Sequence, residues 1–589
     1  MRQTKIVGTI GPASDSPEVF RALVDAGLDV VRFNFSHGNH EGHKKNMDLV
    51  KEVRAEKEIP LAILMDTKGP EIRVKNMEDN TILVRGEEVM LKSGDFTGNK
   101  NNVPITYEEL YKDVVPGNVL LINDGKIHLE VLEVMGDAIK TRVLEGGLLQ
   151  TRKGMNAPGI RVNLPAVTTQ DELDIAFAIS QDVDFIAASF IRKAEDVLSI
   201  RRFLDEHGGE DIQIISKIEN REGYQNLEEI LEASDGIMVA RGDLGMEMPI
   251  EEIPHAQKRM IDLANQMGKI VITATQMLES MTQSPLPTRA EATDVANAII
   301  DGTDAIMLSG EMAAGQFPVQ AVRMMDRIAR ATEKELDAPT FSHKVMIQNY
   351  MDNVTYAVSK GAVDASNQLQ AKAILTATSS GFTARKIAMN RPKCPVMAGT
   401  TSEKVRRQLM LLRGVVSFPI GQARHSDELF QMLESTAVEH GLVTKGDIVV
   451  ITCGIPIGVA GATNMIKVQA VGEITVKGQG VGKKRIKGTI RMVDEVPENF
   501  NEGDIIYTRG IDESMAEMVK KASGIITAEG GFTSIAAIAA VNLNIPTIIG
   551  VKGAEHLFYD GLEIILDAKL GIASNSEKFF EDENSDSWV

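Results

Sequence analysis

Eight short apolar runs recur along the first 311 residues, and most of them are followed by a segment with helical periodicity. The runs lie at 5–11, 30–37, 62–67, 184–190, 213–219, 236–243, 271–277 and 305–311. Strands that alternate with helices predict parallel β/α architecture. Eight such units in about 250 residues, once one insertion is removed, favour a closed (β/α)8 TIM barrel. An open, doubly wound parallel sheet would give similar runs and is the alternative.

The region from Glu71 to Val167 interrupts this alternation. It contains short β-like runs such as Thr81–Val84 and Val119–Ile122, and the second is followed by Asn123-Asp124-Gly125. Asp-Gly between alternating runs is a hairpin signal. We therefore expect a small β-barrel domain, inserted after the third strand, that acts as a lid over the active face of the barrel.

Two further segments with strand and helix signals follow the barrel. The first has strand-like runs at 373–376, 396–398 and 447–452, and the second combines a strand-like 524–527 with a helix-like 534–541. The predicted domains are the barrel at 1–70 and 168–345, the lid at 71–167, an α/β domain at 346–473 and a last domain at 474–589.

Composition narrows the functional classes. The chain has 589 residues and a formal net charge of −20, which disfavours nucleic acid as the main partner. No apolar run is long enough to span a membrane, and the N-terminus lacks the apolar stretch of a signal peptide. The only cysteines, Cys394 and Cys453, lie far apart, which fits a reducing compartment. We therefore expect a cytoplasmic protein with neither nucleic acid nor a membrane as a partner.

Polar residues follow the apolar runs, and active sites of such barrels lie at the C-terminal ends of the strands. Lys217 and Glu219 are two residues apart in a strand-like run, so their side chains point to the same side. Asp243 ends the next run. One cation and two carboxylates at neighbouring strand ends suit a metal-assisted reaction on a phosphate. The carboxylates could instead serve as acid and base, and Lys217 could form a Schiff base, as in a barrel lyase.

A second cluster is predicted from the run at 30–37, where polar and apolar residues alternate. Arg32, Asn34 and Ser36 share one face, and Asp66 and Thr67 end the next strand. Oxygen ligands of this kind suit hard cations such as potassium or magnesium, and Arg32 could bind a phosphate. A buried salt-bridge network near the barrel mouth is the structural alternative.

Three turns carry further polar groups. The glycines of 240–245 expose backbone amides that can hold a carboxylate or phosphate, although a tight turn also needs them. Thr275 ends the following strand and could add a hydroxyl, whereas Thr288–Glu291 fits a capping box and predicts a helix start. In the α/β domain, the loop 378–383 follows a strand and opens a helix, which suits either ordinary capping or an anion.

Six of these strings, in this order, resemble the motifs of the pyruvate kinase family. They are 31–38, 66–73, 214–220, 238–245, 273–278 and 308–311, and the resemblance covers about residues 1–473. It implies phosphoryl transfer from phosphoenolpyruvate to ADP, giving pyruvate and ATP in the last step of glycolysis. It also implies Mg²⁺ (or Mn²⁺) and K⁺ as cofactors, a regulatory role for the α/β domain, and a homotetramer.

The resemblance implies a role for each matching residue. Lys217 would stabilise the transferring phosphoryl group, Arg32 would contact the phosphate, and Glu219 and Asp243 would hold magnesium. The backbone of Gly242 and Asp243, with the Thr275 hydroxyl, would orient the substrate carboxylate, while Thr275 and Ser309 resemble residues implicated in protonation of the enolate. The implied potassium ligands are Asn34, Ser36, Asp66 and Thr67, with Glu71 matching the potassium-dependent form. The implied nucleotide contacts are Asn34, His37, Arg73 and Arg152.

The α/β domain would bind a phosphorylated effector. The matching loop residues are Thr378, Ser379, Ser380, Gly381 and Thr383. The tryptophan and arginine that usually hold the second phosphate of fructose 1,6-bisphosphate are not evident, since the region reads Gly454–Gly458 and the sole tryptophan is Trp588. A monophosphate such as AMP or ribose 5-phosphate is therefore expected. A metabolite sensor that binds phosphate without turnover is the non-enzymatic alternative.

Residues from about 474 resemble the swivelling β/β/α phosphohistidine domain of phosphoenolpyruvate-utilising enzymes. The string Glu529–Ala537 carries the resemblance, with Ile535 at the place of that family's histidine. Isoleucine cannot carry a phosphoryl group, so this domain is not expected to catalyse. The extra domain suggests a bacterial, Bacillus-like form.

Overall fold

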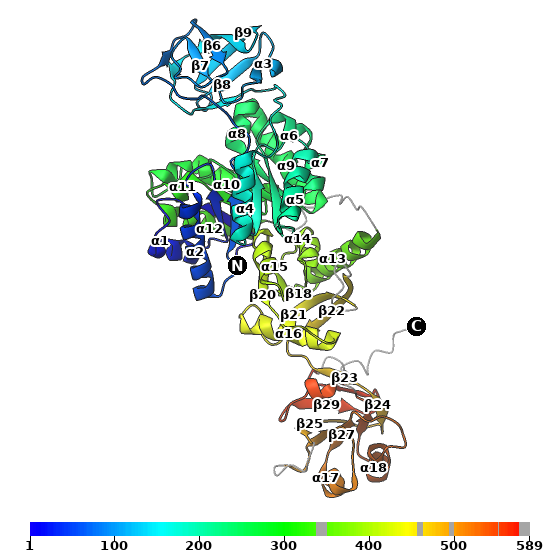
Figure 1. Ribbon diagram of the computed structural model, residues 1–589. Coiled ribbons are helices and arrows are strands. Elements are labelled where there is room, and N and C mark those ends of the chain that lie inside the picture. The colour runs from blue at the N-terminus through cyan, green and yellow to red at the C-terminus, as the bar shows by residue number, and fades with distance from the viewer. Residues whose placement is uncertain (337–349, 456–462, 494–499, 552, 577–589) are drawn as a thin grey trace. The chain divides into compact units, whose positions relative to one another are not determined.

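The computed structural model describes residues 1–336, 350–455, 463–493, 500–551 and 553–576. Eight parallel strands close into a barrel in the order β1-β17-β16-β15-β14-β13-β3-β2 (Figure 1). Their bounds are Lys5–Thr9 (β1), Val30–Asn34 (β2), Ala62–Asp66 (β3), Phe185–Ala188 (β13), Gln213–Ile218 (β14), Gly236–Ala240 (β15), Ile270–Ala274 (β16) and Ala305–Leu308 (β17). The register of β1 with β17, from Lys5↔Ala305 to Gly8↔Leu308, closes the ring and excludes the open sheet.

The strands of the barrel are buried along nearly their whole length, because side chains fill the interior and helices cover the outside. Strands buried on both faces read as continuous apolar runs, which is why the runs were visible in the sequence. The strands end earlier than the runs do. β2 ends at Asn34, so Ser36 lies in a turn where its N–H donates to Asn34 Oδ1 at 3.1 Å. β15 ends at Ala240, and Asp243 belongs to the first turn of a helix.

Two helices of the barrel begin at capping boxes. The predicted capping box at Thr288 is confirmed, since its side chain and that of Glu291 cap the helix reciprocally. A second box, Thr168 with Asp171, starts the helix that follows the lid. The bounds are Pro17–Asp25 (α1), His40–Lys57 (α2), Thr169–Ser180 (α4), Ala194–Glu206 (α5), Arg221–Gln225 (α6), Leu227–Ala233 (α7), Arg241–Glu247 (α8), Ile253–Met267 (α9), Arg289–Asp301 (α10), Gly310–Ala313 (α11) and Pro318–Glu335 (α12).

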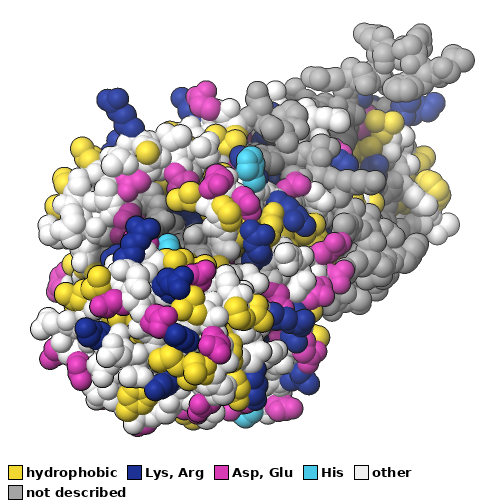
Figure 2. Space-filling model, turned by 90° about the horizontal axis from the view of Figure 1, so that it is seen from above, with side chains coloured by type: hydrophobic (Ala, Val, Ile, Leu, Met, Phe, Trp, Pro, Cys, Tyr) yellow, Lys and Arg dark blue, Asp and Glu magenta, His cyan; other side chains and the backbone are white. Residues whose placement is uncertain are grey.

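The inserted β domain is a seven-stranded sheet, in the order β4-β12-β8-β9-β10-β6-β7, with a separate pair β11-β5. Its elements are Ile72–Arg73 (β4), Ile82–Leu83 (β5), Glu88–Lys92 (β6), Asn102–Pro104 (β7), Leu110–Asp113 (α3), Val119–Ile122 (β8), Ile127–Met135 (β9), Ala138–Glu145 (β10), Gly147–Leu148 (β11) and Gly154–Asn156 (β12). The predicted hairpin joins β8 and β9, and its turn residues Asn123, Asp124 and Gly125 have positive φ. On the face seen in Figure 2, basic and acidic side chains are interspersed with apolar ones.

A five-stranded sheet follows, in the order β20-β19-β18-β21-β22. Its elements are Tyr350–Gln368 (α13), Ala373–Ala377 (β18), Phe382–Ala388 (α14), Val396–Thr400 (β19), Glu403–Gln408 (α15), Val415–Pro419 (β20), Ser426–Glu439 (α16), Ile448–Gly454 (β21) and Thr463–Ala470 (β22). The predicted domain boundary at 345/346 lies outside the described residues.

The last segment forms an eight-stranded sheet, in the order β23-β30-β29-β25-β26-β27-β28-β24. Its elements are Thr475–Lys477 (β23), Gln479–Val481 (β24), Arg485–Met492 (β25), Ile505–Thr508 (β26), Ala516–Lys521 (α17), Gly524–Thr527 (β27), Ile535–Leu543 (α18), Thr547–Ile549 (β28), Glu563–Asp567 (β29) and Ile572–Ser574 (β30). By contacts the chain divides into two compact units, 1–423 with 450–467, and 424–449 with 468–589. Over the described ranges, no helix combines the length and apolar character that a membrane crossing needs.

Candidate active site

Lys217 is the centre of a buried polar cluster at the C-terminal end of the barrel strands. Its Nζ lies 3.0 Å from Asp66 Oδ1 and 2.8 Å from Glu219 Oε1, and it donates to Ser189 Oγ at 2.8 Å. Burial opposes the ammonium, but the charges of Asp66 and Glu219 outweigh this and raise the pKa of Lys217 above its ordinary value. The residue is therefore a fixed cation and not a neutral amine.

Asp66, at the end of β3, is held by two cations. Arg32 Nε donates to Asp66 Oδ2 at 2.6 Å, and Lys217 takes the other oxygen. Burial would raise the pKa of Asp66, yet Arg32 and Lys217 outweigh burial and lower it. A second bond, from Arg32 Nη1 to Thr9 Oγ1 at 2.9 Å, fixes the guanidinium. Asp66 thus aligns both cations at the mouth of the barrel.

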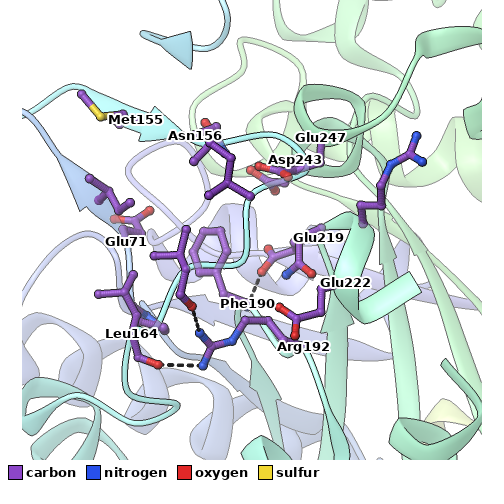
Figure 3. Close-up of a pocket in the computed structure, with 18 of the residues that line it drawn as sticks. Glu71, Met155, Asn156, Leu164, Phe190, Arg192, Glu219, Glu222, Asp243 and Glu247 are labelled. Atoms are coloured by element: carbon purple, nitrogen blue, oxygen red, sulfur yellow. Dashed lines mark hydrogen bonds between the residues drawn. The ribbon is translucent and has the colours of Figure 1, made fainter. Parts of the chain in front are cut away.

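Glu219 and Asp243 are carboxylates whose pKa values are shifted upward. Burial and the charge of Asp243 raise the pKa of Glu219 to about 7, against the opposing charge of Lys217. Burial likewise raises the pKa of Asp243, with Lys217 opposing it. Two carboxylates that repel one another on a partly shielded pocket wall are stabilised by a bound cation. Figure 3 shows both side chains on the wall of the same pocket.

The turn between β15 and α8 is braced from the end of β16. Gly242 N–H donates to Thr275 Oγ1 at 2.8 Å, and Arg241 Nη2 donates to the Thr275 carbonyl at 2.7 Å. Thr275 has a positive φ of 66°, which L residues adopt at a cost, so this bracing maintains a strained backbone. The turn brings the Gly242 amide and the Thr275 hydroxyl into contact.

The four predicted potassium ligands lie on β2, β3 and the turns that follow them. Asn34 Oδ1 accepts the Ser36 N–H, and the Thr67 carbonyl accepts Ser189 Oγ at 2.6 Å. The adjacency of β2 and β3 is direct, since Asn34 pairs with Asp66. These groups offer uncharged and anionic oxygens, which fit a hard monovalent cation.

A cavity of about 1060 Å³ lies between the barrel and the inserted domain. The predicted nucleotide residues His37, Arg73 and Arg152 line it, together with Glu219 and Asp243. Arg73 Nε donates to Glu71 Oε2 at 2.5 Å, and its Nη1 donates to the Arg152 carbonyl at 2.9 Å. The cavity therefore joins basic groups of the lid to the carboxylates of the barrel.

Ser309 follows β17 and is oriented through a buried carboxylate. Its N–H donates to Glu311 Oε2 at 2.8 Å, and Glu311 Oε1 accepts the Leu278 N–H at 3.0 Å. Glu311 thereby links the ends of β16 and β17.

Two functional groups were missed by sequence reasoning. Ser189 Oγ accepts from Lys217 and donates to the Thr67 carbonyl, and the Phe190 N–H donates to Glu219 Oε2 at 2.6 Å (Figure 3). Ser189 follows β13, so its position at a strand end was an available signal. The Phe190 amide carries no side-chain signal.

The side chains of the site limit the kind of metal ion that it could bind. In the described part of the chain, no group of three or more His, Cys, Asp and Glu side chains is arranged to hold a metal ion. Glu219 and Asp243, on the wall of one pocket, offer the two carboxylates that a divalent cation such as magnesium can take when water and substrate oxygens complete its shell.

The predicted effector loop connects β18 with α14. Ser379 and Ser380 are exposed, whereas Thr378 and Thr383 are buried and Thr383 Oγ1 lies 2.6 Å from Thr463 Oγ1. Gly381 has a φ of 80°, a conformation that favours glycine. The sequence predicts that the region Gly454–Gly458 lacks a contact for a second effector phosphate. Residues 456–458 of this region lie outside the described residues, as does Trp588.

In the last domain, Ile535 is the first residue of α18 and is about half exposed at 51%. Its side chain holds no polar group, so the place expected for a phosphohistidine has no nucleophile.

Comparisons with known proteins cover nearly the whole chain. A family model described as "Pyruvate kinase, barrel domain" matches residues 1–322, and one described as "Pyruvate kinase, alpha/beta domain" matches residues 356–469. A third, "PEP-utilising enzyme, mobile domain", matches residues 500–571.

Among curated relatives, the pyruvate kinase of Sporosarcina psychrophila is 46% identical over 98% of this chain and 99% of its own. That of Geobacillus stearothermophilus is 46% identical over 97% and 98%. Among solved structures, a pyruvate kinase from Cryptosporidium parvum is 40% identical with a TM-score of 0.76, covering 80% of this chain and 96% of that one.

Proposed function

Because the chain belongs to the pyruvate kinase family, we propose that it transfers the phosphoryl group of phosphoenolpyruvate to ADP with magnesium and potassium as cofactors. The matches confirm the resemblance that the motifs gave, including the extra last domain and the Bacillus-like relatives. The observation that carries the proposal is the buried cluster in which Lys217 is held by Asp66, Glu219 and Ser189.

Lys217 would act as the electrostatic partner of the moving phosphoryl group. A permanently charged ammonium held by two carboxylates offsets the charge of the phosphoryl oxygens during transfer. The raised pKa of Lys217 argues against the Schiff-base alternative, because imine formation needs a neutral amine. Arg32, fixed by Asp66 and Thr9, would contact the same phosphate.

Glu219 and Asp243 would hold the magnesium ion, which supplies Lewis-acid charge to phosphate oxygens when it is bound. This assignment replaces the acid-base alternative, because both carboxylates share a site where a cation would relieve their repulsion. Potassium would be bound by Asn34, Ser36, Asp66 and Thr67.

The substrate carboxylate would lie against the turn after β15. The amides of Gly242 and Asp243, at the start of α8, and the Thr275 hydroxyl would orient it. Thr275 and Ser309 would take part in protonation of the enolate, because they follow β16 and β17 at the same end of the barrel. ADP would occupy the cavity beside His37, Arg73 and Arg152, which line it. Asn34, at the end of β2 three residues before His37, would contact the nucleotide from the barrel.

We further infer that a phosphorylated small molecule, AMP or ribose 5-phosphate, regulates the enzyme at Thr378, Ser379, Ser380, Gly381 and Thr383, in a homotetramer in the cytoplasm. The exposed hydroxyls of Ser379 and Ser380 support a phosphate site. Arg385, in α14, lies 4.0 Å from Asp235, the residue before β15. The opposite end of β15 leads into Gly242 and Asp243, which gives the effector loop a short structural route to the site.

The test is a lactate dehydrogenase-coupled assay with purified full-length chain. Pyruvate should form only when phosphoenolpyruvate, ADP and magnesium are present, and potassium should increase the rate. Phosphate binding without ADP-dependent pyruvate would instead support the metabolite sensor.

A further inference from the structure

The loop Ser189–Arg192, between β13 and α5, contacts both the catalytic cluster and the lid. At its start, Ser189 Oγ accepts from Lys217, and the Phe190 N–H donates to Glu219. At its end, the Arg192 guanidinium donates to two backbone carbonyls, from Nη1 to Val162 at 2.7 Å and from Nη2 to Leu164 at 2.8 Å (Figure 3). These four consecutive residues therefore join Lys217 and Glu219, which are proposed to act in phosphoryl transfer, to residues 157–167. Residues 157–167 form the lid connection, which returns from the inserted domain to the barrel.

The segment that Arg192 holds belongs to the lid. It runs from β12 back to α4, and the side chains of Ile160, Val162 and Leu164 pack against the core of the inserted domain. Since side chains alternate along an extended segment, its apolar groups face the lid while its carbonyls remain for a donor from the barrel. A planar guanidinium can donate to two acceptors at once, which an ammonium cannot do with the same geometry.

The guanidinium itself is fixed from the barrel. Asp196, in the first turn of α5, accepts the Arg192 N–H at 3.0 Å and its Nε at 3.2 Å. The Arg192 side chain is 15% exposed and that of Asp196 is 4% exposed. Asn226 Nδ2 donates to the Arg192 carbonyl at 2.9 Å. Charge-assisted bonds in such a shielded position are stronger and more directional than surface ion pairs.

The outgoing lid connection meets the same loop. Gly69, after β3, has a φ of 69°, and a Cβ added there would lie 2.8 Å from Ser189 Cβ. Its N–H donates to Asp171 Oδ1 at 3.0 Å, in the capping box that starts α4. Both connections of the inserted domain are thus packed onto elements that touch the loop.

We propose that Arg192 is a positioning residue for phosphoryl transfer: it fixes the returning lid connection to the loop that aligns Lys217 and Glu219. The inference rests on the roles proposed above for those two residues. The lid carries Arg73 and Arg152, so loss of the hydrogen bonds from Arg192 to the lid connection weakens nucleotide binding. The same loss displaces Ser189 and Phe190, which slows phosphoryl transfer.

The test compares Arg192→Lys with the wild-type enzyme. The variant keeps the positive charge beside Asp196 but cannot donate to the Val162 and Leu164 carbonyls at the same time with the same geometry. We expect kcat to fall and KM for ADP to rise, so that kcat/KM for ADP drops by roughly tenfold, as for loss of one charge-assisted hydrogen bond. KM for phosphoenolpyruvate should change less than twofold. Amide hydrogen exchange should increase in residues 157–167 and not in the barrel strands.

Arg202→Lys is the matched control, because Arg202 lies in α5, the helix that contains Asp196, and pairs with Glu195 at 2.7 Å. It should match wild type in every measurement. Unchanged kinetics in Arg192→Lys would overturn the proposal. So would a loss of activity with increased exchange throughout the barrel, since Arg192 would then be a general stabilising residue.

Should Arg192→Lys not fold, Asp196→Asn carries the same test, because it releases the guanidinium without removing it. Its effect should be in the same direction as that expected for Arg192→Lys, and smaller. The hydrogen-exchange measurement does not depend on turnover. It therefore tests whether Arg192 holds residues 157–167 even if the roles proposed for Lys217 and Glu219 are wrong.

Discussion

Lys217 Nζ lies 2.8 Å from Glu219 Oε1, and both side chains are buried. The pair is not a self-contained salt bridge. Lys217 has a second carboxylate in Asp66, whereas Glu219 faces the like charge of Asp243. Lys217 thus has two carboxylates to balance one positive charge, whereas Glu219 and Asp243 share too little positive charge. A bound metal ion is expected to complete the charge balance in such an arrangement.

The first prediction concerns pH and stability without metal. The pKa of Glu219 is about 7 in the folded chain, against 4.5 ordinarily, so the folded state binds more protons between these values. The contribution of Glu219 to stability is thus fully present below pH 4.5 and is lost as pH rises through about 7. In the presence of a chelator, the melting temperature of the wild type should fall relative to that of Glu219→Gln as the pH rises through this window. The same pH dependence of the melting temperature in both proteins would contradict a raised pKa of Glu219.

The second prediction concerns the divalent metal. Asp243→Asn removes one of the two carboxylates, so the magnesium concentration for half-maximal activity should rise at least about tenfold. Titration of activity with magnesium at saturating substrates measures this. Asp48→Asn, at an exposed i,i+4 pair with Lys44, is the control and should not change the titration. An unchanged requirement in Asp243→Asn would remove this residue from the metal site.

The third prediction concerns the monovalent cation. Asn34→Ala removes an amide oxygen beside Asp66, so stimulation by potassium should be reduced while the barrel stays folded. Rates in potassium and in a bulky organic cation at equal ionic strength give the ratio. A ratio equal to that of wild type would show that potassium acts elsewhere.

The fourth prediction concerns regulation. Ser380→Glu places a carboxylate on the exposed loop before Gly381, where it would repel a phosphate. Activation by AMP or ribose 5-phosphate should disappear, with basal turnover retained. Persistent activation would refute this location for the effector.

The barrel could be predicted from sequence because its strands are buried on both faces. Strands of this kind consist largely of consecutive apolar residues, which are visible in the sequence. The ends of the strands were less accurate. In the run predicted at 236–243, β15 ends at Ala240 with the last apolar residue, and Arg241, Gly242 and Asp243 already form the first turn of α8. Apolar pattern reports burial, and backbone bonding decides where a strand ends.

The side chains of the site could be anticipated where polar residues follow strands, as for Lys217, Glu219 and Asp66. Arg192 could not be, since its partners are backbone carbonyls 30 and 28 residues away, which carry no side-chain signal. The Phe190 amide was hidden for the same reason.

Turnover of Lys217→Met in the coupled pyruvate assay tests whether the Lys217 ammonium stabilises phosphoryl transfer. A neutral side chain of similar length leaves Asp66 bonded to Arg32 and Ser189, so the fold should persist. We predict that kcat falls at least about hundredfold, as for loss of one group that stabilises the transition state. Lys44→Met, at the exposed pair with Asp48, is the control and should be unaffected. A kcat for Lys217→Met equal to that of wild type would contradict the account.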